Sequence, residues 1–367
     1  MNAKFVFDPD LLASMAGGRS ALDIRFLNIH TLEQAEAFIS GYGYDLNQNA
    51  DSEKLWYYHR RAVVLLTEKL GFDIETIPEV LRERKNLEDL RRLLIYASSR
   101  SAEEQDFQRW SCAVLRAMHV FVHAENDLFS FFAEEIQKQI LTPFESSVSF
   151  SGEEHRPVLN SKVSNLPAIE LMEYTHKAFK TSTSTVVKLL AKPDALALSI
   201  FDKVGVRFVT KSIFDSFQVL RFLWRENLVS FPHIMPDQSS NNLYPTSLFV
   251  NVCNEIVQKG LDKDLDDKKI ESLLLLNLEK FKEDHLLLRK ENLFSAEDYR
   301  FVKFISRKLI KIPPQDGKEG FSFFYPFEVQ ILDHNSFEII QSGPSEHQAY
   351  KDRQKQAAKE RLFPQQN

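Results

Sequence analysis

The stretch "FEVQILDHNSFEIIQSGPSEHQAYK", Phe327 to Lys351, decides the class of the second half of this chain. Its first residues alternate as in a β-strand, which places Glu328 and Gln330 on one face and apolar side chains on the other. A helix-like segment follows. A carboxylate in a half-buried strand is costly unless it is paired or bound to a metal ion. The stretch therefore predicts a β-sheet that carries a polar site.

Composition sets limits on the partners. The 367 residues carry a formal net charge of −6, so there is no global attraction to nucleic acid, duplex DNA included, or to an anionic membrane; a local basic site is compatible with this charge. The first residues lack the basic start and apolar stretch of a signal peptide, and no run approaches a membrane span. The sequence therefore predicts a cytoplasmic protein with no membrane partner.

The spacing of apolar residues along the chain changes near residue 150. Residues 1–150 show apolar side chains at helical spacing, and a polar, aperiodic stretch follows at 145–167. Residues 151–360 then mix helical and strand patterns, with a helical insertion at about 258–310. The predicted class is α+β, an all-α N-terminal domain followed by a mixed sheet flanked by helices.

Each segment of the second domain receives a predicted state from its pattern. Strands are expected at 195–210, 243–253 and 319–333. Helices are expected at 168–192, 212–227, 267–290 and 295–312.

A basic stretch, "KTSTSTVVK", places Lys180, Ser184 and Lys188 at successive four-residue steps. On a helix these side chains share one face, and two ammonium groups with a hydroxyl suit a polyphosphate. A solvated basic helix face explains the same pattern.

The stretch "FDKVGVRFVT" begins with Asp202 beside a buried strand. Mg²⁺ is the usual partner of one or two carboxylates and substrate phosphates, and Gly205 would permit close approach by a backbone or a ligand. Asp202 and Arg207 would share a site only if Asp202 lies on the turn into the strand. Polar residues at a strand end are the alternative interpretation.

Glu328 supplies a second carboxylate for such a site. On a strand next to Asp202 it would complete a magnesium site and could accept a proton from an attacking hydroxyl. The alternative is a glutamate on the solvent face of an edge strand.

Taken in order, these motifs resemble the synthetase domain of RelA/SpoT-type alarmone synthetases, which has a nucleotidyltransferase-like fold. The resemblance covers roughly residues 165–355. The matching positions are Lys180, Ser184, Lys188, Asp202, Gly205, Arg207, Glu328, Gln330, Ile331, Gln341, Ser342, Gly343, His347, Tyr350 and Lys351.

This resemblance implies an Mg²⁺-dependent transfer of pyrophosphate from ATP to a ribose 3′-hydroxyl of a guanine nucleotide or, as a lesser alternative, of an RNA end. Asp202 and Glu328 would hold Mg²⁺, and Glu328 would help to deprotonate the acceptor. Lys180, Ser184, Lys188 and Arg207 would hold the ATP phosphates. Asn242 and Tyr244 would stand for the acceptor-binding Asn and the guanine-stacking Tyr.

The sequence departs from the family pattern at Ala178, Leu332 and Asp237, where cationic residues are expected. These changes favour a second interpretation, a catalytically inactive regulator that binds a nucleotide or a protein. A third is a helical scaffold whose mixed half is only structural. The N-terminal helices and the 258–310 insertion are the candidate surfaces for a protein partner.

Overall fold

A computed structural model describes residues 16, 20–125, 128–152, 155–163, 165–177, 182–192, 201–261, 265–280, 300–314, 319–342 and 347–364 of the chain. The described residues form two compact units, a helical unit and a sheet unit. The helical unit takes its residues from 1–130, 181–200 and 351–367, and the sheet unit from 131–180 and 201–350. The units are thus interleaved along the chain, whereas the sequence predicts a single boundary near residue 150.

The helical unit is built from amphipathic helices around the long helix α7. Its helices are α2 (Leu32–Gly41), α3 (Asn49–Val64), α4 (Glu79–Arg82), α5 (Arg84–Leu87), α6 (Arg91–Ser98), α7 (Gln105–Glu125), α9 (Ser182–Ala191) and most of α14 (His347–Leu362). Thr31 caps α2, because its side chain accepts the backbone N–H of Gln34 as the capping-box spacing predicts. Helix α9 belongs here because its apolar residues, including Val186 and Leu190, are buried and the helix packs on α7.

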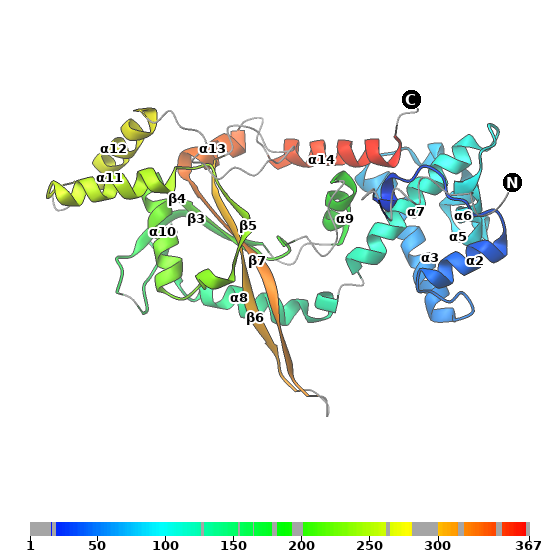
Figure 1. Ribbon diagram of the computed structural model, residues 1–367, viewed down its shortest axis with the longest axis horizontal. Coiled ribbons are helices and arrows are strands. Elements are labelled where there is room, and N and C mark those ends of the chain that lie inside the picture. The colour runs from blue at the N-terminus through cyan, green and yellow to red at the C-terminus, as the bar shows by residue number, and fades with distance from the viewer. Residues whose placement is uncertain are drawn as a thin grey trace. The chain divides into compact units, whose positions relative to one another are not determined.

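The sheet unit contains seven strands in the order β1-β2-β3-β4-β7-β6-β5 (Figure 1). The strands are β1 (Val148–Ser151), β2 (Arg156–Leu159), β3 (Ile169–Lys177), β4 (Gly205–Thr210), β5 (Ile234–Asn241), β6 (Val302–Ile312) and β7 (Phe321–Asp333). All neighbouring pairs are antiparallel except β4 and β7, which run parallel. The predicted mixed sheet with flanking helices is confirmed at this level.

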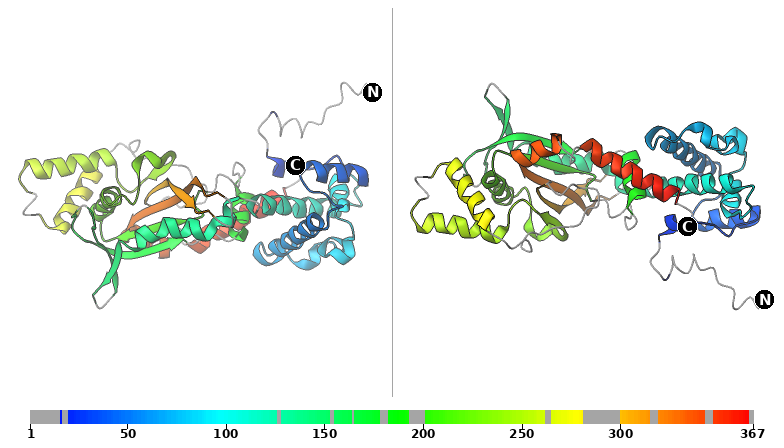
Figure 2. Two further views of the ribbon diagram at one scale, coloured as in Figure 1. Left: turned by 90° about the horizontal axis from the view of Figure 1, so that it is seen from below. Right: turned by 90° about the horizontal axis from the view of Figure 1, so that it is seen from above.

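Helices cover one face of the sheet. The helices of this unit are α8 (Ala133–Glu145), α10 (Ile213–Arg225), α11 (Thr246–Gln258), α12 (Asp267–Lys280) and α13 (His334–Ser342). Phe144 of α8 packs its ring against Phe208 of β4 and Phe327 of β7, and α8 runs along the sheet (Figure 2). On α10, the Ser216 hydroxyl hydrogen-bonds to Thr210 of β4 at 2.7 Å. This covered face forms the core of the unit.

Three predicted element states are wrong. Residues 169–177 and 302–312 are strands rather than helices, and 246–258 is a helix rather than a strand. The predicted strand that ends at residue 210, the helix at 212–227 and the strand at 319–333 are observed as β4, α10 and β7. Of the helical insertion predicted at about 258–310, residues 267–280 form helix α12, and residues 302–310 belong to strand β6.

Candidate functional site

The parallel pair β4 and β7 forms the centre of the candidate site. Gly205 lies opposite Glu328 in the register, and the backbone N–H of Glu328 donates to the carbonyl of Val204 at 2.9 Å. A Cβ atom on Gly205 would lie 2.8 Å from the carbonyl oxygen of Glu328. The prediction that Gly205 permits close approach is confirmed, and the group that approaches is the backbone of Glu328.

Glu328 is buried and holds two ammonium groups. Its side chain is 7% exposed, and Lys177 Nζ lies 2.5 Å from Oε1. Lys303 Nζ lies 3.8 Å from Oε2, and each lysine side chain remains about a third exposed, at 32% and 33%. Burial acts to raise the pKa of Glu328, but the charges of Lys177 and Lys303 outweigh it and hold the pKa below its usual value. Glu328 is therefore a carboxylate that neutralises lysines.

Two further predicted residues lie on the same face. Arg207 and Gln330 are opposite each other in the register, and Arg207 Nε donates to Gln330 Oε1 at 2.9 Å. Asp202 lies on the turn that precedes β4, the condition under which it can share a site with Arg207. Its negative charge acts on both Lys177 and Glu328. We call the group of Lys177, Asp202, Arg207, Lys303 and Glu328 the Glu328 cluster.

Lys177 and Lys303 were missed by sequence reasoning. Each lies on a strand, β3 or β6, whose residues were predicted to be helical. With the correct strands, the signal would have been a lysine at the end of β3 and a lysine that alternates with apolar residues on β6.

The described residues do not fit a magnesium ion between Asp202 and Glu328. Each carboxylate oxygen of Glu328 faces an ammonium group. The ammonium groups lie where a magnesium ion would bind these oxygens, and their charge repels a divalent cation. Within the described ranges, no group of three or more His, Cys, Asp or Glu side chains could hold a metal ion.

The predicted acceptor residues have structural roles. Tyr244 is fully buried against Phe217 and Phe249, and its hydroxyl donates to the carbonyl of Leu274 at 3.0 Å. The ring has no exposed face, so in this structure no base could stack on it. Asn242 accepts the backbone N–H of Phe301 at 2.8 Å and so connects the end of β5 to the start of β6.

The remaining predicted phosphate ligands belong to the helical unit or fall outside the described residues. Ser184 and Lys188 are on α9, which belongs to the helical unit, and Lys180 lies outside the described residues. His347 is the first residue of α14, and its side chain is outside the described set. The Glu328 cluster thus contains Asp202, Arg207 and Glu328 from the predicted site, with Gln330 beside Arg207.

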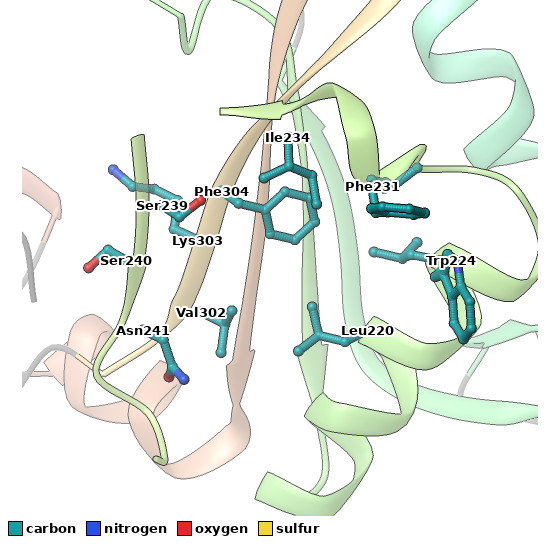
Figure 3. A pocket seen from close by; sticks show the side chains of 12 residues that line it. Leu220, Trp224, Phe231, Ile234, Ser239, Ser240, Asn241, Val302, Lys303 and Phe304 are labelled. Atoms are coloured by element: carbon teal, nitrogen blue, oxygen red, sulfur yellow. The ribbon is translucent and has the colours of Figure 1, made fainter. Parts of the chain in front are cut away.

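An apolar cavity of about 220 Å³ lies between α10 and the β5–β6 edge of the sheet. Leu220, Trp224, Phe231 and Phe304 contribute to its walls. Figure 3 shows Lys303 at its margin, with the amine turned away from these apolar side chains. The cavity and the Glu328 cluster therefore share Lys303, whose amine pairs with Glu328.

Among the described helices, none is long and apolar enough to cross a membrane. Comparison with known proteins adds no family to this picture, because no family model and no curated protein matches the chain.

Proposed function

We propose that the sheet unit binds the phosphate groups of a nucleotide at the Glu328 cluster and acts as a regulator without catalysis, on a nucleotidyltransferase-like sheet. The observation that carries this proposal is the pairing of Glu328 with Lys177 and Lys303. A buried acid that pairs with two lysines, each about a third exposed, keeps both cations in place for a stronger anion.

The charge balance of the cluster supports an anionic ligand. Three cationic side chains face two carboxylates, and a phosphate group would compete with Glu328 for Lys177 and Lys303. The family pattern expects an Arg at position 178, where this chain has Ala178. Lys177 supplies a cation from the neighbouring position.

Pyrophosphoryl transfer from ATP to a ribose 3′-hydroxyl is the second candidate. The nearness of Asp202 to Glu328, in the chain order that the resemblance implies, favours it. A general base works best when its pKa lies near the operating pH. The two lysines instead lower the pKa of Glu328 and move it away from neutral pH. Catalysis would require the ligand to draw both lysines away from Glu328.

Titration calorimetry with ATP, GTP and inorganic tripolyphosphate, each with and without Mg²⁺, tests the proposal. The decisive variant is Glu328→Gln. If Glu328 competes with phosphate for the lysines, its neutral substitute tightens binding by about tenfold, with or without Mg²⁺. If Glu328 holds magnesium for a transferase, the same variant weakens Mg²⁺-dependent binding instead.

The double variant Lys177→Ala and Lys303→Ala weakens binding by at least about tenfold, since each charged hydrogen bond contributes about 1.5–3 kcal/mol. Lys259→Ala is the matched control, because Lys259 is an exposed lysine of the same unit whose partner is Glu255 on the same helix. Equal losses in the double variant and the control would contradict the proposal. Radiolabelled ATP incubated with GTP or GDP tests the second candidate, which predicts a pyrophosphorylated product.

A further inference from the structure

The outer part of the β6–β7 hairpin is a two-stranded ribbon. The two strands pair from Val302↔Ile331 to Ile312↔Phe321, whereas β5 pairs with β6 only as far as Ser306 (Figure 1). Among the described strands, the segment 307–312 therefore has β7 as its one strand partner. Beyond Ser306, the outer edge of β6 is therefore not paired with any of the described strands.

One face of this ribbon is already covered. Ile310, Ile312 and Tyr325 are buried, and the ring of Phe132 packs against Phe321 and Phe323. On α8, the Gln139 amide hydrogen-bonds to both backbone groups of Lys311, at 2.7 and 3.0 Å. These contacts hold the ribbon against the sheet unit and leave the opposite face toward solvent.

The exposed face combines cations with apolar side chains. Leu309 lies opposite Phe324 in the register, and alternation places Arg307 and Lys311 on their side of the ribbon. Phe324 is 45% exposed and Leu309 is 39% exposed, and both cations are exposed. We call Arg307, Leu309, Lys311 and Phe324 the ribbon face.

Phe324 is held in a fixed orientation. The guanidinium of Arg307 lies over its ring with 5.6 Å to the centroid, and the His233 ring meets it edge-on at 4.9 Å. A guanidinium plane beside an exposed ring gives two flat surfaces on which a base can stack. Within the described residues, neither Arg307 nor Lys311 forms an ion pair with a carboxylate.

We infer that the ribbon face binds single-stranded nucleic acid, with bases stacked on Phe324 and Arg307 and backbone phosphates held by Arg307 and Lys311. Aromatic side chains interleaved with cations are the chemistry by which single strands are bound without sequence readout. A duplex keeps the faces of its bases stacked inside, so it cannot use Phe324 in this way. An acidic protein segment would use the cations but would not require the ring.

Fluorescence anisotropy with labelled 12-nucleotide single-stranded RNA, the DNA of the same sequence and the corresponding duplexes tests the inference. We expect saturable binding of a single strand at low salt, preferred over its duplex. The logarithm of the affinity should fall against the logarithm of salt concentration with a slope of about −1.4, for two phosphate contacts. Comparison of the single-stranded RNA with the single-stranded DNA shows which of the two nucleic acids the ribbon face binds more tightly.

Phe324→Ala should weaken single-strand binding by about fivefold or more, because stacking of one base contributes about 1–3 kcal/mol. The double variant Arg307→Glu and Lys311→Glu should abolish it. Phe150→Ala, an exposed ring on β1 of the same sheet, and Lys259→Glu are the matched controls and should leave it unchanged.

The inference stands apart from the nucleotide proposal, so Lys177→Ala should retain single-strand binding. Absence of single-strand binding at low salt, equal affinity for the duplex, or full retention of binding by Phe324→Ala would each overturn the inference. Retention in Phe324→Ala with loss in the charge-reversal variant would overturn the stacking on Phe324 and leave only contacts between the cations and the phosphate backbone.

Discussion

At the scale of single residues, the sequence predicted a magnesium ion shared with Asp202 as the partner of Glu328, whereas the structure pairs Glu328 with Lys177 and Lys303. Side-chain alternation predicted that Glu328 and Gln330 share a face, and only the family resemblance predicted that Asp202 and Arg207 lie near them. The structure places Arg207 beside Gln330 and Asp202 on the turn before β4. The ammonium group nearest to Glu328 belongs to Lys177, which lies 151 residues earlier in the chain. No local pattern specifies a pair at such a separation, so the ion pair could not be predicted.

The lowered pKa of Glu328 predicts how stability depends on pH. A carboxyl whose folded pKa lies below its unfolded value, about 4.3, stabilises the fold fully above that value. This stabilisation is lost as the pH falls through the folded pKa. Denaturant unfolding between pH 6 and pH 3 should therefore show a smaller loss of stability in Glu328→Gln than in the wild type. Glu255→Gln, which changes an exposed acid, should keep the wild-type slope.

At the scale of elements, the errors have identifiable causes. Val302, Ile305, Leu309 and Ile312 follow one another at spacings of three and four residues, which imitates an amphipathic helix. They lie on a strand because β6 is flanked by β5 and β7 and is buried on both faces for part of its length.

Helix α11 shows the opposite error. Its β-branched and aromatic residues favour a strand, but Phe249 stacks on Phe217 of α10 with ring centroids 3.9 Å apart. Tertiary packing therefore decided both elements against their local pattern.

The β4–β7 pair predicts the effect of a single methyl group. Gly205→Ala places Cβ at 2.8 Å from the carbonyl oxygen of Glu328, a backbone atom that cannot rotate away. We expect a loss of about 1–3 kcal/mol in the free energy of unfolding, measured by urea titration. Gly41→Ala is the matched control, since nothing lies within 4 Å of its added Cβ at the end of α2. A neutral Gly205→Ala would mean that the two strands lie farther apart than described.

At the scale of the whole molecule, the two units share the chain in alternating segments. Arg361, near the end of α14, pairs with Asp23 and donates to the carbonyls of Leu189, Leu190 and Lys192 at the end of α9. Three separate stretches of sequence thus meet at one guanidinium. The predicted boundary near residue 150 followed composition, which does not reveal such long-range contacts.

Arg361→Met should therefore destabilise the helical unit, although it lies in the last turn of the described chain. The guanidinium is only 10% exposed, and its loss leaves Asp23 and the carbonyls of α9 without this donor. We expect about 2–3 kcal/mol less stability by denaturant unfolding. Lys355→Met, whose pairing with Asp352 is exposed, should cost less than about 1 kcal/mol. Equal effects of the two variants would contradict the role of Arg361.

The parallel pairing of residues 205–210 with 328–333 also bears on synthesis. A ribosome releases the chain from its N-terminus, so β4 can pair with β3 early, but its other edge has no strand partner until β7 has emerged. The helical unit waits too, because it includes most of α14, which follows β7 in the chain. Neither unit can therefore be completed before β7 and α14 have emerged, and the edge of β4 that later pairs with β7 stays open until then.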